Sequence, residues 1–410
     1  MRRDMTLSLR GWCGRLTAAS IALSSVLVFG QSESPTVLPL RTAPTETLTV
    51  NPGFRDWSPT TVAGTTILGG NQTNRGGVVA IDTVSGKVKW TYRPVFTSGT
   101  ASVSTAPAVS GDVVITPFAA ANPGAVIALS LASGKEVWRG PDPAQNAAVA
   151  VNGALAYVLG KDGVFHALEA VTGRERWRVA FTTNRAVCAS SPIVRGDTIY
   201  LTSSAGATPG DAAKPAGYYL FALDANTGQE RWRYRAEAPY VHDGVCLRQP
   251  VVTSDTIFAA GDNFLYAVHR ATGRDRWKPI EVRRSVDGRV RPVEVHGLVD
   301  ADTAVIGMTS GFLIAFDKTL GQTLWELPGN YNTGSPSTMV AGNILYFQGS
   351  PGSNPAAASR GTLHGLDLAT HTILWSFKRP TAEPNWPFGS VTPVNGGLWV
   401  DSYQALVKLQ

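Results

Sequence analysis

The chain has 410 residues, including 42 Gly, 26 Pro and 11 Trp, and only 16% of its residues are charged. The low charged fraction excludes a disordered polyelectrolyte, and the many turn residues and large aromatic side chains favour an all-β architecture. The formal net charge is +6, but the first 30 residues hold four Arg and one Asp, so about +3 remains beyond them. That balance excludes the strongly basic class of nucleic-acid-binding proteins.

Residues 1–30 are predicted to be a signal peptide. Four arginines precede an apolar run of 15 residues, 16–30, which is short for a membrane span and typical of the apolar region of an export signal. Val28 and Gly30 are small enough for the −3 and −1 positions of a cut before Gln31, and an uncleaved anchor is the alternative interpretation. After removal of the signal we expect no transmembrane segment. Residues 31–44, rich in Pro, Thr and Ser, are interpreted as a linker, and residues 45–410 as one domain.

One short motif occurs seven times in this domain. The copy "ALDANTGQERW" at residues 222–232 has counterparts that start at residues 80, 128, 167, 267, 315 and 365. The tryptophans that end the copies are Trp90, Trp138, Trp177, Trp232, Trp277, Trp325 and Trp375. Six copies also hold a turn glycine: Gly86, Gly134, Gly173, Gly228, Gly273 and Gly321. A period between 39 and 55 residues is typical of β-propeller blades.

The content of one period agrees with a blade of four strands. Residues 190–236 contain the runs "PIV", "TIYLT", "YLFALD" and "ERWRY", separated by Gly, Asp and Asn turn residues. The repeated motif is interpreted as the hairpin between the third and fourth strands, in which Asp bonds backbone N–H groups and Gly takes a positive φ. The tryptophan would fill the gap to the next blade. We therefore interpret the repeated Trp and Gly residues as structural.

These residues resemble the tryptophan-docking motif of the quinoprotein (PQQ-repeat) propellers, Ala-x-Asp-x-x-Thr-Gly-x-x-x-Trp, over about residues 55–410. Single copies depart from it: Ser130, Glu169 and His269 stand at the Asp position, His371 at the Gly position and Leu320 at the Thr position. This variation indicates that no single copy carries chemistry.

We expect an all-β, eight-bladed β-propeller of four-stranded antiparallel blades, with seven blades as the alternative. The carboxyl-terminal residues 390–410 supply three strands of an eighth blade, and the segment 45–51 is available as its fourth strand. Closure by an amino-terminal strand leaves no exposed sheet edge. The resemblance implies the same closure, because eight-bladed members of the family close in this way.

Sites are expected on one face of the ring. The connections between first and second strands and between third and fourth strands are uniformly tight. The long loops 203–217 and 349–361 join second to third strands, and 93–105, 279–297 and 379–390 join one blade to the next. Long loops on a rigid scaffold are where binding residues concentrate.

Three groups of candidate binding residues are expected on this face. The first comprises Arg283, Arg284, Arg289 and Arg291, which suit an acidic partner or a phosphate or form a solvated mixed-charge loop. The second comprises His242, Asp243 and Arg248, with either an acid–base role or a structural one. The third is the aromatic pair Trp386 and Phe388, as an exposed anchor for a partner or a packed loop.

The chain retains two cysteines beyond the signal, Cys188 and Cys246. Each stands four residues before the Pro of a first strand, in consecutive repeats. Equivalent positions near the propeller axis lie close together, so we expect a disulfide in an oxidising compartment. Two buried free thiols are the alternative.

The favoured function is an exported, noncatalytic scaffold that binds protein partners in the cell envelope. The chain resembles the noncatalytic exported propellers, which include the lipoprotein subunit of the outer-membrane β-barrel assembly machine, although the lipobox Cys of that lipoprotein is missing. We expect a monomeric ring that is periplasmic, envelope-associated or secreted, with an envelope or secreted protein as partner and no nucleic acid.

The family name also raises a PQQ-binding quinoprotein or PQQ-dependent dehydrogenase as the alternative. The resemblance implies that such enzymes hold PQQ over a Ca²⁺ bound by Glu, Asn and Asp, beside a vicinal disulfide. This chain has no Cys-Cys pair, and its loops offer few Ca²⁺ ligands. We therefore expect no cofactor, no metal and no catalytic residue. A carbohydrate- or wall-binding scaffold is a third hypothesis, for which no residue is diagnostic.

Overall fold

The computed structural model describes most of the chain from residue 39 to its end. The described residues are 39–54, 57–71, 76–96, 101–119, 123–143, 148–180, 190–205, 217–236, 247, 249–261, 263–286, 289–309, 312–331, 338–351, 362–378, 390–394, 397–401 and 405–410.

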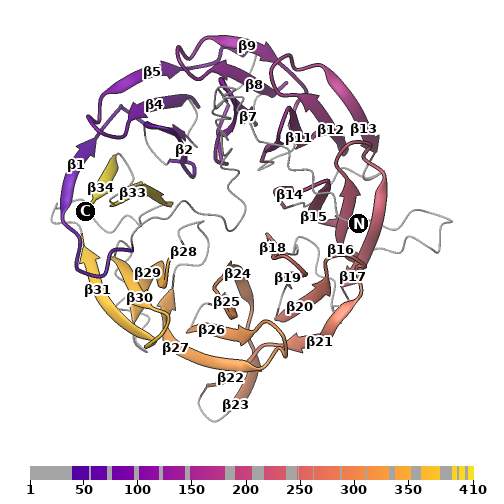
Figure 1. Cartoon of the computed structure of the whole chain (residues 1–410), viewed down its shortest axis with the longest axis vertical. Helices are drawn as coiled ribbons and strands as arrows, with labels where there is room; N and C mark the ends of the chain where they lie inside the picture. The colour runs from indigo at the N-terminus through magenta and orange to yellow at the C-terminus, as the bar shows by residue number, and fades with distance from the viewer. Residues whose placement is uncertain are drawn as a thin grey trace, which may run out of the picture.

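Eight antiparallel four-stranded blades surround a central axis (Figure 1), which confirms the expected propeller. Blade 1 consists of β2 (Thr61–Ala63), β3 (Thr66–Gly70), β4 (Val78–Asp82) and β5 (Val88–Tyr92). Blade 2 consists of β6 (Ala108–Ser110), β7 (Val113–Phe118), β8 (Ala125–Ser130) and β9 (Glu136–Arg139). Blade 3 consists of β10 (Ala150–Asn152), β11 (Leu155–Leu159), β12 (Val164–Glu169) and β13 (Glu175–Ala180). Blade 4 consists of β14 (Ile193–Arg195), β15 (Thr198–Ala205), β16 (Gly217–Asp224) and β17 (Glu230–Ala236).

The second half of the ring repeats this order. Blade 5 consists of β18 (Val251–Val252), β19 (Thr256–Gly261), β20 (Phe264–His269) and β21 (Asp275–Glu281). A separate two-stranded ribbon, β22 (Arg283–Val286) and β23 (Arg289–Pro292), follows it. Blade 6 consists of β24 (Val295–Asp300), β25 (Ala304–Thr309), β26 (Phe312–Asp317) and β27 (Thr323–Tyr331). Blade 7 consists of β28 (Met339–Ala341), β29 (Ile344–Pro351), β30 (Thr362–Asp367) and β31 (Thr372–Lys378). The last residues of β27 also pair with the end of β29, which joins blades 6 and 7.

The two ends of the propeller close the ring in blade 8, as the sequence predicts. This blade consists of β32 (Val391–Val394), β33 (Gly397–Asp401), β34 (Leu406–Leu409) and β1 (Glu46–Val50). Thr49 of β1 pairs with Val407 of β34, and Thr45 and Gln410 exchange two backbone hydrogen bonds of 2.8 and 3.0 Å. The closing strand therefore removes the sheet edge that β34 would otherwise expose.

The apolar core is divided among the junctions between blades. A buried cluster lies at each of the eight junctions; the cluster between blades 1 and 2, for example, joins Leu68 and Trp90 to Val114 and Ile127. The middle strands are covered on both faces, so every residue of β7, β19 and β25 is buried. This explains why they are nearly continuous apolar runs. In the outer strands at the rim (Figure 1), such as β13, exposed residues alternate with partly buried ones.

The repeated motif forms the hairpin at the end of each blade through local turn chemistry. Asp224 Oδ1 accepts hydrogen bonds from the amide nitrogens of Asn226 and Thr227, at 2.9 and 3.0 Å. Gly228 then adopts a φ of 74°, which glycine reaches without steric cost. A Cβ on Gly228 would lie 2.7 Å from Cε3 of Trp177 in the preceding blade. The glycine therefore serves both the turn and the close approach of two blades.

Candidate functional site

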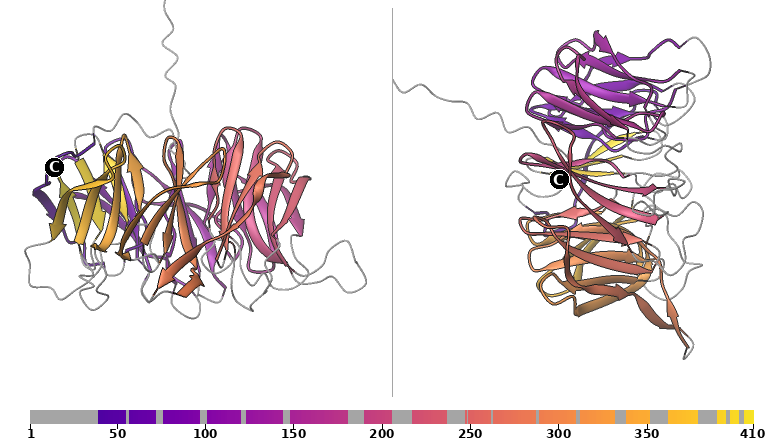
Figure 2. Two further views of the ribbon diagram at one scale, coloured as in Figure 1. Left: turned by 90° about the horizontal axis from the view of Figure 1, so that it is seen from below. Right: turned by 90° about the vertical axis from the view of Figure 1, so that its right-hand side faces the viewer.

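The strand order gives the ring two different faces. Turns that join first to second and third to fourth strands lie on one face, here called the turn face, and the remaining connections lie on the opposite loop face. Figure 2 shows the ring edge-on, with the strands running between the two faces. Much of the loop face lies outside the described residues, including residues 206–216, 352–361 and 379–389.

The arginine-rich segment forms a β-ribbon, where the sequence predicted an irregular loop. Arg284 pairs with Arg291, and Val286 pairs with Arg289, so only two residues separate the strands. The sequence signal for this hairpin is the Asp-Gly pair between "RRSV" and "RVRP", because Asp-Gly favours a two-residue turn. The ribbon lies between β21 and β24, on the loop-face side, and projects from the ring (Figure 1).

Two of the four arginines attach the ribbon to the ring. Arg283 Nε donates a hydrogen bond of 2.7 Å to Glu281 Oε2, and Asn263 of blade 5 holds the other Glu281 oxygen at 2.7 Å. The guanidinium of Arg284 lies over the ring of Phe312, 4.9 Å from its centroid, a cation–π contact with blade 6. The base of the ribbon therefore bridges blades 5 and 6.

The other two arginines point their charge into solvent. Every residue of β23 is exposed, and Val290 is 61% exposed. Within the described part of the chain, neither Arg289 nor Arg291 has an acidic partner. The strand register places Arg291 directly opposite Arg284. Like charges in such a pair are unfavourable. An acidic partner would offset this positive charge.

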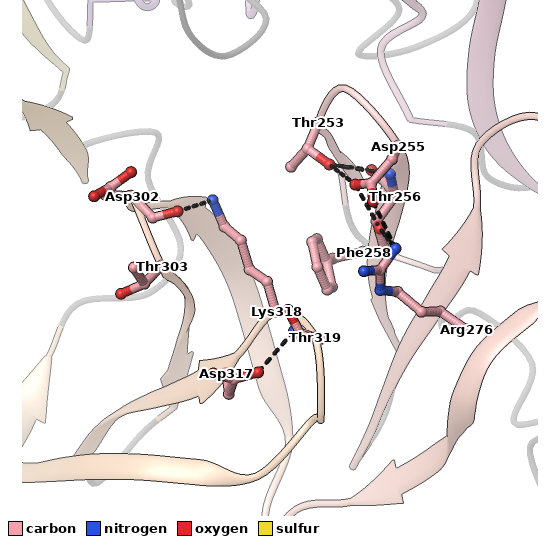
Figure 3. Close-up of a pocket in the computed structure, with 10 residues that line it drawn as sticks. All are labelled: Thr253, Asp255, Thr256, Phe258, Arg276, Asp302, Thr303, Asp317, Lys318 and Thr319. Carbon is pink, nitrogen blue, oxygen red and sulfur yellow. Dashed lines mark hydrogen bonds and ion pairs between the residues drawn. The ribbon is translucent and has the colours of Figure 1, made fainter.

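A polar groove lies on the turn face between blades 5 and 6 (Figure 3). Its volume is about 340 Å³. Its lining residues come from the turns of the two blades: Thr253, Asp255, Thr256, Phe258, Arg276, Asp302, Thr303, Asp317, Lys318 and Thr319. None of them belongs to a group of residues that the sequence marks as a candidate site.

The charged side chains that line this groove are largely paired within the protein. Arg276 lies 2.6 Å from Asp255 Oδ2, and Lys318 Nζ donates to the carbonyl oxygen of Asp302 at 2.8 Å. Burial acts to raise the pKa of Asp255, but hydrogen bonds from Thr256 and Arg276 outweigh it and hold this pKa below its usual value. The groove is therefore a mixed-charge surface in which both cations already have partners.

The same junction lacks a link that other junctions have. The buried indole N–H of Trp277 has no acceptor among the described residues, whereas the corresponding indole of Trp138 donates to the carbonyl oxygen of Ala170 at 2.9 Å. The third-to-fourth-strand turn of blade 6 is also held by a longer hydrogen bond than the turn of blade 5. Lys318 N lies 3.3 Å from the carbonyl oxygen of Thr303, whereas Arg270 N lies 2.8 Å from that of Asp255.

The remaining predicted site residues lie outside the described residues. These are His242, Asp243, Arg248, Trp386 and Phe388, together with Cys188 and Cys246. Within the described ranges, no three His, Cys, Asp or Glu side chains come together in a way that could hold a metal ion. No helix in this part of the chain is long and apolar enough to cross a membrane.

Comparison with known families gives a match over most of the domain. The sequence model of the family described as outer membrane protein assembly factor BamB matches residues 41–148 and 122–377. The chain is 28% identical over 284 residues to BamB of Burkholderia pseudomallei, covering 66% of this chain and 65% of that protein. It is 26% identical over 252 residues to BamB of Moranella endobia, covering 58% of each.

A third relative belongs to a different class of protein. The chain is 25% identical over 229 residues to the serine/threonine-protein kinase AfsK of Streptomyces griseus, covering 53% of this chain and 26% of the kinase. The chain thus spans less than two thirds of the length of each of these three relatives.

Solved structures share the propeller fold. BamB of Moraxella catarrhalis superposes with a TM-score of 0.63 at 18% identity, covering 90% of this chain and all of that structure. A quinohemoprotein alcohol dehydrogenase of Comamonas testosteroni superposes with a TM-score of 0.64 at 16% identity, covering 90% of this chain and 76% of that one. At these identities the likeness concerns the fold alone.

Proposed function

Because the chain belongs to the family of outer membrane protein assembly factor BamB, we propose that it is a protein-binding scaffold of the cell envelope. Its BamB relatives are outer membrane protein assembly factors. We propose this role for the chain in a general form, as a noncatalytic ring that binds a protein partner. We further propose that it is exported and that the loop face is the binding face.

The observation that carries this proposal is the β22–β23 ribbon. Its base is fastened to two blades by Arg283 and Arg284, whereas Arg289, Val290 and Arg291 are exposed at its outer strand. A fixed base with an uncompensated basic strand suits a partner that brings carboxylates, because arginine forms charge-assisted, two-pronged hydrogen bonds with them. An isolated two-stranded ribbon is marginally stable in water, so a partner would also stabilise it.

The PQQ-binding quinoprotein stays the alternative hypothesis. A quinone held over Ca²⁺ needs a set of oxygen ligands from several carboxylate or amide side chains, and the described residues bring together no such acidic group. We therefore derive no catalytic step from a cofactor.

Site-specific photocrosslinking tests the proposal in cells that produce the protein. A photoreactive residue at position 290 should give a discrete adduct with a protein partner. Position 171 is the matched control, because Val171 is also 61% exposed but lies in a turn of blade 3 on the turn face. Equal adducts at the two positions, or none at position 290, would refute a loop-face binding site.

Charge reversal gives a second, independent test. Arg289→Glu with Arg291→Glu should abolish the adduct at position 290. Lys135→Glu with Arg274→Glu changes the net charge by the same amount at exposed positions in turn-face hairpins and should leave the adduct unchanged. Loss of the adduct in both double variants would show that the effect comes from overall charge and not from the ribbon.

A further inference from the structure

Indole N–H groups link successive blades on the turn face. In blades 1 to 4 the outer-strand tryptophan donates to a backbone carbonyl oxygen in the third-to-fourth-strand turn of the following blade. The distances are 2.8 Å from Trp90 to Leu131, 2.9 Å from Trp138 to Ala170, 3.0 Å from Trp177 to Ala225 and 3.2 Å from Trp232 to Arg270. A continuous hairpin in the next blade supplies the acceptor each time.

Blade 8 has no such hairpin, because its third and fourth strands are the two ends of the propeller chain. β34 ends at Leu409 and β1 begins at Glu46, so Trp375 of blade 7 has no turn to contact. Trp375 Nε1 nevertheless donates a hydrogen bond of 2.7 Å to a backbone carbonyl oxygen, that of Leu40. Leu40 therefore stands in the place of the missing turn.

The residues around Leu40 are held by blade 7 at several points. The amide nitrogen of Leu40 donates to the hydroxyl of Tyr346 at 2.9 Å, and its side chain packs on the apolar cluster between blades 7 and 8. Arg41 forms an ion pair of 3.0 Å with Asp367, whose side chain is only 6% exposed. Pro39 lies over Gly342, with Cγ 3.2 Å from the position of an added Cβ.

These contacts place the segment on the turn face. Asp367 begins the third-to-fourth-strand turn of blade 7, and Gly342 lies in its first-to-second-strand turn. Both turns belong to the face opposite the β22–β23 ribbon, which connects a fourth strand to the next blade.

We propose that residues 39–41 form a strap that replaces the missing turn of blade 8 and fastens the amino-terminal segment to the turn face. The strap has two consequences. It supplies an indole-to-carbonyl link between blades 7 and 8, where the following blade has no hairpin to provide one. It also sets the orientation of the propeller, because anything joined to the protein through its amino-terminal segment meets the turn face and leaves the loop face directed away.

Limited proteolysis of the full chain tests the strap. Trypsin cleaves after arginine, and cleavage of the 41–42 bond requires the segment to open, so its rate reports the open population. Asp367→Asn keeps the Oδ1 acceptor of the turn, which Ala369 and Asn343 use, and removes the charge that holds Arg41. We expect cleavage at Arg41 to become about tenfold faster, since hydrogen bonds to charged groups are the stronger ones.

The matched control is Asp317→Asn in blade 6. Asp317 Oδ1 accepts the amide of Thr319 at 2.8 Å, just as Asp367 Oδ1 accepts the amide of Ala369 at 2.8 Å, but no strap contacts it. This variant should leave cleavage at Arg41 unchanged. Equal rates in the wild-type protein and Asp367→Asn, or an equal increase in Asp317→Asn, would overturn the proposal.

Hydrogen exchange gives a readout without a protease. The Leu40 amide should be protected in the wild-type protein, and Tyr346→Phe should speed its exchange because the acceptor hydroxyl is gone. Tyr157→Phe is the control, since Tyr157 donates to the carbonyl oxygen of Ala225 at 3.1 Å within an ordinary junction. A Leu40 amide that exchanges as fast as an unfolded chain would refute the strap. Neither measurement involves a binding partner, so its outcome is separate from that of the proposed function.

Discussion

His371 stacks on Trp325, with ring centroids 4.9 Å apart and planes inclined by 33°. Six of the seven repeated hairpins place glycine at the corresponding position; an added Cβ would come close to the tryptophan of the preceding blade at five of them, and to Leu48 at Gly86. His371 adopts a φ of 56° and is the only non-glycine residue with positive φ in the described part of the chain. Its imidazole therefore offsets a backbone cost through contact with the indole.

This relationship predicts effects of different size for two substitutions at His371. His371→Ala keeps the unfavourable φ and loses the contact between the rings, so it should destabilise the fold by about 0.5–1.5 kcal/mol. His371→Gly loses the stacking but relieves the backbone, and should lie closer to the wild-type protein. Chemical denaturation of both variants measures the difference; a less stable Gly variant would contradict this account.

The hairpins that keep the glycine predict a larger loss of stability for a substitution at Gly228 than for His371→Ala. Gly228→Ala adds both the cost of a φ of 74° and a contact of 2.7 Å with Trp177, and overpacking of this kind costs about 1–3 kcal/mol beyond the backbone term. Gly196→Ala is the matched control, because Gly196 also has a positive φ but an added Cβ would meet nothing within 4 Å. The melting temperature should fall further for Gly228→Ala than for Gly196→Ala. Equal losses would show that the tryptophan contact is unimportant.

The turn carboxylates predict a loss of stability in acid. Hydrogen bonds from the backbone and hydroxyl of Ser85 lower the pKa of Asp82 from 3.8 to about 2. A folded-state pKa below the unfolded value stabilises the fold above that unfolded value, and the stabilisation disappears as pH falls from 3.8 towards 2. The melting temperature should therefore drop over this range.

Asp82→Asn keeps the acceptor oxygen but does not titrate, so its melting temperature should fall less on acidification than that of the wild-type protein. Lys87→Gln removes a charge from the same turn without removing a carboxylate, and should follow the wild-type acid profile. Indistinguishable acid profiles for Asp82→Asn and the wild-type protein would contradict this assignment.

The disulfide between Cys188 and Cys246 stays a prediction, because both residues lie outside the described ranges. Their described neighbours meet at one residue: Ser190 Oγ accepts the amide of Thr202 at 2.9 Å, and Thr202 Oγ1 donates to the carbonyl oxygen of Leu247 at 2.9 Å. Closing the loop between Cys188 and Cys246 would stabilise the fold by about 4 kcal/mol on the chain-entropy model. Alkylation of the native protein without reductant, followed by intact-mass analysis, should modify neither cysteine; two alkylated cysteines would rule the bond out.

The candidate site was only partly predictable from the sequence. The four arginines of residues 283–291 stand out by composition, and the Asp-Gly pair between them signals the ribbon that the structure shows. Composition does not reveal that the four arginines differ in their contacts. Arg283 and Arg284 attach the base of the ribbon to the ring, whereas Arg289 and Arg291 face solvent. This difference depends on contacts with Asn263 and Phe312, which belong to two different blades.

The sequence by itself determined the architecture. The spacing of Trp90 to Trp375 and the turn glycines specify blades, because each hairpin is closed by residues a few positions apart and the tryptophans of blades 1 to 6 meet the next copy of the same turn. The continuous apolar second and third strands predict burial on both faces, and residues 45–51 were correctly expected to close the ring.

Only the tertiary structure decided how the closing junction is completed. Residues 39–41, which composition places in a linker, meet Trp375, Tyr346 and Asp367 more than 300 positions away in the sequence. No local pattern reports such a pairing, because the carbonyl oxygen of Leu40 is a backbone group that every residue has. Its role follows from position alone, once the ring has brought the two ends of the chain to one junction.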